Sequence, residues 1–185
     1  MKLIQYLVLL RGINVGGKNI IKMVDLKASL EEMGFSNVHT YIQSGNVLFE
    51  SDEKDKAILT TKIEMGLSKR FDFLARVVVV SHNELEAIVR AAPDGFGKDD
   101  KKFRYDVIFL KEPLTPKEAM KSVSTREGVD TAHAGKQALY FSRVISRAAQ
   151  SHLTKIIGLP VYQNMTIRNW NTTTKVLALM EGQHG

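Results

Sequence analysis

The sequence of 185 residues contains no cysteine. This absence excludes a disulfide framework, a cysteine nucleophile and any zinc site built on thiolates. No apolar run approaches the roughly 20 residues that a membrane-spanning helix requires. Arg11 interrupts the N-terminal apolar run too early for a signal peptide. We therefore expect a cytoplasmic protein that does not associate with membranes.

Recognisable catalytic motifs are also lacking. None of the five histidines belongs to an HExxH metal motif, and the chain has no GxSxG nucleophile elbow. The adjacent carboxylates Glu31-Glu32 and Asp99-Asp100 fall on the polar face of an expected helix and in an expected loop, which is typical of solvated charge. The sequence predicts no metal and no cofactor, identifies no catalytic residue, and leaves open whether the protein is an enzyme.

Positive charge is concentrated late in the chain. The net charge is +6, and hydrophobic residues make up 44% of the sequence, as in an ordinary globular protein. Between Thr131 and Met180 there is no acidic residue but six basic ones: Lys136, Arg143, Arg147, Lys155, Arg168 and Lys175. Such a field attracts anions, so nucleic acid or a phosphate-bearing ligand is a candidate partner. The alternative is a basic surface that only keeps the protein soluble.

Hydrophobic patterning in the first half indicates the order β-α-β-β-α-β. Strands are expected at 3–10, 38–43, 46–50 and 76–81, and helices at about 23–33, closed by Gly34, and 59–71. We assign residues 1–81 to a first subdomain. Residues 82–103 are interpreted as a linker with a short helix capped by Asn83 and ending at Arg90.

The second half, residues 104–185, repeats this order and adds a C-terminal helix. Strands are expected at 105–110, 129–134, 138–142 and 166–168. Thr115-Pro116 begins one helix, Ser151 caps a second that Gly158 and Pro160 end, and the last begins near Trp170. The predicted fold is α+β, with two consecutive ferredoxin-like (βαββαβ) subdomains. A single larger mixed sheet is the alternative.

Three stretches could carry a site. Residues 11–19 form a glycine-rich loop that could hold an anion, although the spacing is not that of a P-loop and a simple turn is the alternative. Residues 41–47 place polar groups at a hairpin, and residues 166–172 place Trp170 where it could stack on a base or anchor the core. The candidate ligand-binding residues are Arg11, Asn14, Gly16, Gly17, Lys18, Tyr41, Ser44, Asn46, Arg168, Asn169, Trp170 and Asn171.

Together, residues 11–19, 41–47 and 168–172 resemble the family called domain of unknown function 1697. The resemblance implies a bacterial-type cytoplasmic protein with two ferredoxin-like subdomains, and it makes these stretches the first place to look for a site. Family members tend to have a Gly-Arg-Ser-Lys-Leu-Thr segment before the penultimate helix. Here the glycine is missing and His152 stands where a lysine is usual. If that lysine binds phosphate in the family, this chain binds it differently.

Three functions remain open. The first is non-enzymatic binding of an anionic, phosphate-bearing ligand such as a nucleotide or nucleic acid. The second is an enzyme for a small phosphorylated or acidic substrate, held in the cleft between the subdomains by Arg11, Lys18 and Arg168. The third is a protein-interaction or assembly module. The sequence does not identify protein partners.

Overall fold

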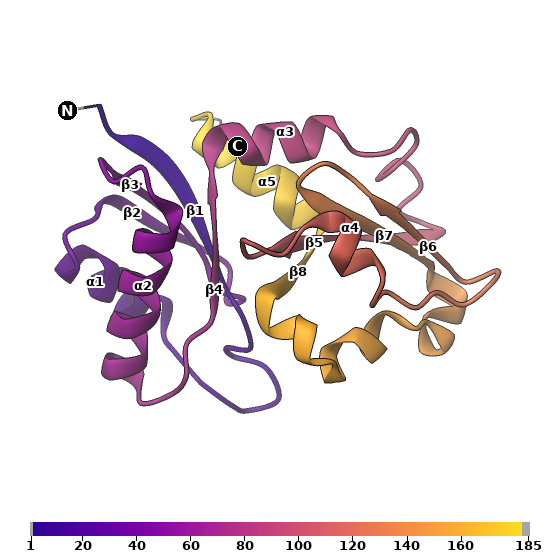
Figure 1. Ribbon diagram of the computed structural model, residues 1–185, viewed down its shortest axis with the longest axis horizontal. Helices are drawn as coiled ribbons and strands as arrows, with labels where there is room; N and C mark the ends of the chain where they lie inside the picture. The colour runs from indigo at the N-terminus through magenta and orange to yellow at the C-terminus, as the bar shows by residue number, and fades with distance from the viewer. Residues whose placement is uncertain (1, 183–185) are drawn as a thin grey trace. The chain divides into compact units, whose positions relative to one another are not determined.

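The computed structural model describes residues 2–182 and divides the chain into two compact units (Figure 1). The first unit runs to Leu85 and includes the end of the last helix from Leu179, and the second spans Glu86–Ala178. The described chain contains two four-stranded antiparallel sheets, so the expected α+β fold with two ferredoxin-like sheets is confirmed. The alternative of one larger mixed sheet was wrong.

In the first unit, β1 lies inside the sheet because its side chains are almost all apolar. The strand order is β2-β3-β1-β4, and Tyr6 through Leu10 are buried. Figure 1 shows α1 and α2 together on one side of this sheet, where Leu26 of α1 and Ile63 of α2 join the core below Val8. The elements are β1 (Ile4–Leu10), α1 (Met23–Glu32), β2 (Ser36–Tyr41), β3 (Asn46–Ser51), α2 (Lys56–Phe71) and β4 (Val77–Ser81).

The helix after β4 begins two residues earlier than expected. Helix α3 (His82–Arg90) follows Ser81 directly, and the Ser81 hydroxyl accepts a hydrogen bond from the Glu84 N–H while the Glu84 carboxylate accepts from the Ser81 N–H. This reciprocal pair is a capping box. The assignment of Asn83 as the cap was therefore wrong, because the serine two residues earlier satisfies the free backbone groups.

The second unit has the strand order β6-β7-β5-β8. Thr115 caps α4 through a capping box with Glu118, which confirms the expected start of this helix. The side chain of Asn169 accepts from the Asn171 N–H at the start of α5, which begins at Trp170 as expected. The elements are β5 (Phe103–Leu110), α4 (Pro116–Met120), β6 (Asp130–Ala134), β7 (Ala138–Val144), β8 (Met165–Asn169) and α5 (Trp170–Met180).

The helix expected from Ser151 is present as a short 3-10 helix, η2 (Leu153–Gly158), which lies between two further 3-10 helices, η1 (Ile145–Gln150) and η3 (Pro160–Asn164). The Ser151 hydroxyl accepts a hydrogen bond from the Leu153 N–H at 3.2 Å, as expected of a cap. Pro160 has no N–H to continue the helix beyond Gly158. Leu153 and Ile156 are buried as expected, because a spacing of three residues serves a 3-10 helix as well as an α-helix.

The strand registers relate the two halves residue by residue. Tyr6 of β1 pairs with Phe49 and Ser81, while Asp106 of β5 pairs with Phe141 and Asn169. Tyr6 therefore corresponds to Asp106, and Ser81 to Asn169. In both halves the last strand leads at once into a helix, so the repeated plan includes α3 and α5.

Candidate functional site

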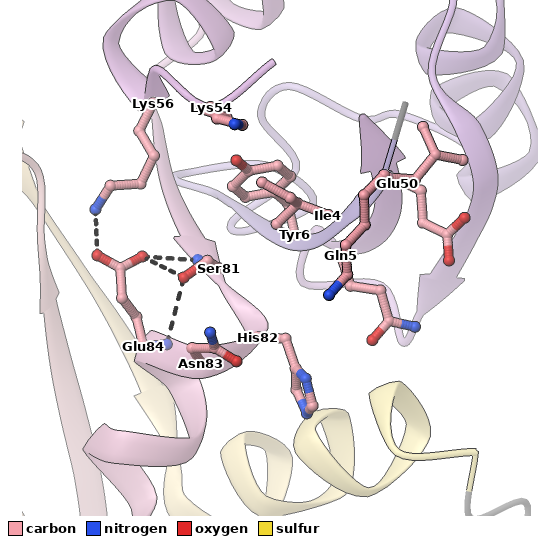
Figure 2. A pocket seen from close by; sticks show the side chains of 12 residues that line it. Ile4, Gln5, Tyr6, Glu50, Lys54, Lys56, Ser81, His82, Asn83 and Glu84 are labelled. Atoms are coloured by element: carbon pink, nitrogen blue, oxygen red, sulfur yellow. Dashed lines mark hydrogen bonds and ion pairs between the residues drawn. The ribbon is translucent and has the colours of Figure 1, made fainter. Parts of the chain in front are cut away.

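A cavity of about 840 Å³ lies in the first unit, where β1 begins and β4 ends (Figure 2). Its walls come from the first residues of the chain, the end of β3, the turn before α2 and the start of α3. The lining residues are Lys2, Leu3, Ile4, Gln5, Tyr6, Glu50, Lys54, Lys56, Ser81, His82, Asn83 and Glu84. This volume falls within the range of small-molecule sites, roughly 300–1,000 Å³.

A hydrogen-bonded network fixes one wall of the cavity. The Glu84 carboxylate accepts from the Lys56 ammonium, from the Ser81 N–H at 2.8 Å and from the Ser81 hydroxyl at 2.9 Å (Figure 2). Burial acts to raise the pKa of Glu84, but the hydrogen bonds from Lys56 and Ser81 outweigh it and lower the pKa below its ordinary value. Glu84 is therefore a carboxylate at neutral pH, with its charge balanced by Lys56.

Tyr6 forms the floor beside this network. Its hydroxyl donates to the Glu53 carbonyl at 2.8 Å. Burial raises the pKa of Tyr6, and the negative charges of Glu84 and Glu53 raise it further. The side chain is therefore a neutral phenol at physiological pH. The side chain lines the cavity but is only 2% exposed, so it offers the cavity little surface.

Lys2 and Lys54 supply positive charge that the protein does not use. Within residues 2–182, neither side chain has a hydrogen bond or an ion pair. The acidic residues of the cavity are already engaged, because Glu84 is held by Lys56 and the Glu50 carboxylate accepts from Asn37 at 2.6 Å. The cavity thus presents two ammonium groups without partners, and its lining of three lysines and two glutamates carries a net charge of +1.

The first two candidate stretches meet at the other end of β1. The Asn14 amide donates to the carbonyls of Ile21 at 3.0 Å and Gln43 at 2.9 Å, which ties the loop after β1 to the β2–β3 turn. Gly45 packs against the same loop, since a Cβ there would lie 2.8 Å from the Ile13 side chain. The sequence could not predict that these two stretches meet, because the Asn14 amide binds backbone carbonyls, which every residue has.

Most candidate residues in these two stretches stabilise their own turns. Gly16 and Gly17 have φ of 58° and 72°, so they form a left-handed turn between Val15 and Lys18, whose backbones pair. The buried Asn46 amide donates to the Tyr41 carbonyl at 3.0 Å and to the Ser44 hydroxyl at 2.9 Å. Lys18 is exposed, and Arg11 and Tyr41 are half-buried. A ligand-binding role for this group remains a prediction.

The third stretch also has internal partners. Arg168 is only 9% exposed, and its guanidinium donates to the Thr166 hydroxyl at 2.9 Å and to the Ile167 carbonyl at 3.0 Å. Burial lowers its pKa to about 10. Asn169 caps α5, Asn171 is exposed, and the Trp170 ring meets the Phe96 ring edge-on at 5.1 Å. Direct ligand contact by these residues remains a prediction.

The acid-free basic span is partly neutralised inside the second unit. Arg143 forms a 3.6 Å ion pair with the buried Asp106, and Arg147 donates to the Gly128 carbonyl and to the Gln150 side chain. His152, the departure from the family pattern, has its ring Nδ1 3.0 Å from the Ser124 hydroxyl. The described residues therefore present less free positive charge here than the sequence suggests.

Sequence reasoning missed the cavity residues Lys2, Lys54, Lys56, Ser81 and Glu84. The spacing Ser81-x-x-Glu84 was a detectable capping-box signal. The two unpaired lysines gave no signal, because an isolated lysine in a polar segment is ordinarily solvated charge.

Over the described part of the chain, no three His, Cys, Asp or Glu side chains gather into a group that could hold a metal ion. Within residues 2–182, no helix combines the length and the apolar character needed to cross a bilayer.

Comparison with known proteins supports the family resemblance. A family model described as "Protein of unknown function (DUF1697)" matches residues 3–140. The chain belongs to this family. It is similar to a solved structure described as that of the conserved bacterial protein SP0830 from Streptococcus pneumoniae, with 28% identity, a TM-score of 0.83, and coverage of 97% of this chain and 99% of that one. No curated protein matches the chain. The family match leaves out the third stretch, which begins after residue 140.

Proposed function

We propose that the protein binds a small anionic ligand, bearing phosphate or carboxylate, in the cavity at the start of β1. The observation that carries this proposal is the pair of unpaired lysines, Lys2 and Lys54, on a cavity whose acidic groups are already engaged. A ligand anion would complete ion pairs that the protein itself leaves open. Hydrogen bonds to charged groups are stronger than neutral ones and favour such an anion.

The remaining walls suit a small organic anion better than a bare inorganic one. Leu3 and Ile4 contribute apolar surface beside the Tyr6 ring, while Gln5 and Asn83 offer amides that can both donate and accept. Ligand sites commonly combine apolar walls with a few fixed polar groups. The Lys56–Glu84–Ser81 network keeps one wall rigid, which lowers the entropy cost of binding.

The protonation states of Tyr6 and Glu84 fit a structural role in the cavity wall. Burial raises the pKa of Tyr6, and the hydrogen bonds from Lys56 and Ser81 lower the pKa of Glu84. Neither of these two groups is suited to exchange a proton near neutral pH, where an acid–base catalyst requires a pKa close to the working pH. We therefore assign both to shaping the binding site and not to catalysis.

Calorimetric titration with ATP and citrate at low salt tests the proposal. Lys54→Ala should weaken binding about tenfold, because a hydrogen bond to a charged group contributes roughly 1.5 kcal/mol. Lys2→Ala should act in the same direction. Lys69→Ala is the matched control, since it removes one exposed charge from the same unit at the far end of α2.

Lys18→Ala separates this cavity from the glycine-rich loop singled out in the sequence. If Lys18→Ala weakens binding while Lys54→Ala does not, the loop is the site and the cavity proposal fails. If neither anion binds the wild-type protein, anion binding itself is refuted. A short oligonucleotide serves as a further ligand: salt-dependent binding that survives Lys2→Ala and Lys54→Ala would point to nucleic acid on another surface.

A further inference from the structure

The repeated plan duplicates the cavity. A second cavity, of about 300 Å³, lies in the second unit and is lined by Asp100, Phe103, Arg104, Tyr105, Ile145, Asn169, Trp170 and Asn171. By the strand registers, six of these eight residues correspond to residues that line the first cavity. Phe103, Arg104 and Tyr105 occupy the places of Leu3, Ile4 and Gln5, and Asn169, Trp170 and Asn171 those of Ser81, His82 and Asn83.

The lining of the second cavity is richer in aromatic rings. Phe103, Tyr105 and Trp170 stand where the first cavity has an aliphatic, an amide and an imidazole side chain, Leu3, Gln5 and His82. Phe96 contacts the rings of both Tyr105, at 4.9 Å, and Trp170, at 5.1 Å, and these contacts hold the rings in place. Tyr105 is buried, whereas Phe103 and Trp170 are half-buried and offer ring surface to a ligand. Such rings favour a planar ligand, because stacking contributes roughly 1–3 kcal/mol per base.

Two charged groups of this cavity have no partner. Within the described residues, neither Arg104 nor Asp100 has a side-chain hydrogen bond or an ion pair. Arg104 lies close enough to lower the pKa of the buried Asp106, whose own ion pair is with Arg143. A guanidinium favours phosphate or carboxylate, and a carboxylate favours an N–H donor. The ligand should therefore offer both an anion and N–H groups.

From these observations we infer that the second unit holds a separate site for a purine mononucleotide. The ring lies against the aromatic wall, the phosphate meets Arg104, and an amino group of the base meets Asp100. The inference goes beyond anion binding in the first unit and does not rest on it. The two cavities share their place in the fold and differ in the chemistry that lines them.

Trp170 provides the readout, because it is the chain's single tryptophan and lines this cavity. Titration with AMP should change Trp170 fluorescence to saturation. Adenosine should cause the same change with about tenfold weaker affinity, because it lacks the phosphate that Arg104 holds. Inorganic phosphate alone should leave the fluorescence unchanged. The absence of a saturable change with AMP would overturn the inference.

Arg104→Ala should weaken the binding of AMP about tenfold and leave the affinity for adenosine unchanged. A general loss of folding would weaken the binding of both ligands. Arg126→Ala is the matched control, since Arg126 is exposed in the same unit and lies outside the cavity. If Arg104→Ala binds AMP as tightly as wild type, the assignment of the phosphate is wrong. Lys54→Ala should leave the Trp170 response intact; loss of the response in that variant would place AMP in the first cavity and end the inference.

Discussion

The two halves follow one plan but fill the same position differently. At the register position shared by Tyr6 and Asp106, the first half has a phenol whose hydroxyl donates to the Glu53 carbonyl, and the second half has a carboxylate with an oxygen that lacks a hydrogen-bond partner among the described residues. Two residue pairs further along, the first half has Ser51 and the second has Arg143. The second half therefore places an ion pair where the first half places a tyrosine and a serine.

The difference shows that the same strand order can form with different residues at corresponding core positions. Within residues 2–182, Asp106 Oδ2 and Arg143 Nε are both buried without a hydrogen bond, and so is Asp130 Oδ1 on the neighbouring strand. Buried polar atoms without partners are costly. The helix-facing side of the second sheet is thus the less satisfied of the two, and its ion pair stabilises by preventing an uncompensated charge more than by strong attraction.

The largest expected effect comes from breaking this ion pair. Arg143→Ala should lower the free energy of unfolding by about 3 kcal/mol near neutral pH, because it removes the ion-pair partner of the buried Asp106 carboxylate and leaves only the exposed Arg104 nearby. Ser51→Ala, at the corresponding place in the first half, should cost only about 1 kcal/mol for the hydrogen bond from the Glu53 N–H. Urea unfolding of both variants measures the difference.

The cost of Arg143→Ala should also depend on pH. Burial raises the pKa of Asp106 above 3.8, although Arg143 and Arg104 lower it in part. The stability that Asp106 contributes is thus fully present below its unfolded pKa and is lost as the pH rises through its folded pKa. Acidification should therefore shrink the destabilisation in the variant. Equal destabilisation at acidic and neutral pH would show that the carboxylate is not the cause.

A second expected effect concerns the wall of the second cavity. Gly97 has φ of 81°, and a Cβ there would lie 2.2 Å from Trp170 Nε1. Gly97→Ala should destabilise the protein by about 2 kcal/mol through backbone strain and overpacking, and should shift the Trp170 emission. Gly95→Ala has nearly the same φ, 80°, with open space around it, so it should cost only about 1 kcal/mol. Identical effects would rule out the close approach to Trp170.

The smallest expected effect is a loss of stability at alkaline pH. Burial raises the pKa of Tyr140 to about 12, and its hydroxyl donates to the Ile88 carbonyl. The folded protein therefore keeps a proton that the unfolded chain releases near pH 10, so stability should fall as the pH rises from about 10 to about 12. Tyr140→Phe should remove this part of the pH dependence. If its alkaline unfolding curve matches that of wild type, Tyr140 is not responsible.

The sequence predicted the strands and the repeat of the plan well, because both rest on local patterns. The apolar run before Arg11 and the four valines before Ser81 identify β1 and β4 as strands by themselves, although only β1 lies inside the sheet. The helix expected from Ser151 forms as a 3-10 helix, and the sequence did not determine its type because Leu153 and Ile156 have a spacing that two kinds of helix share. Pro160, which lacks an N–H, limits its length.

The candidate cavity was beyond sequence reasoning for a different reason. Lys2, Lys54 and Glu84 lie in three separate segments, and only the pairing of β1 with β3 and β4 brings these segments to one place. The glycine-rich loop drew attention instead because its composition is unusual. In the structure its asparagines and glycines are used to build turns.

An NMR titration of the backbone amides with ATP tests the central claim most directly, namely that the cavity at the start of β1 is the first unit's anion site. In a Trp170→Phe/Arg104→Ala background, which disables the second cavity, the account predicts saturable shifts in residues 2–6, 53–56 and 81–84, and their loss in Lys54→Ala. Shifts confined to residues 11–19 and 41–46, or the absence of any saturable shift, would contradict it.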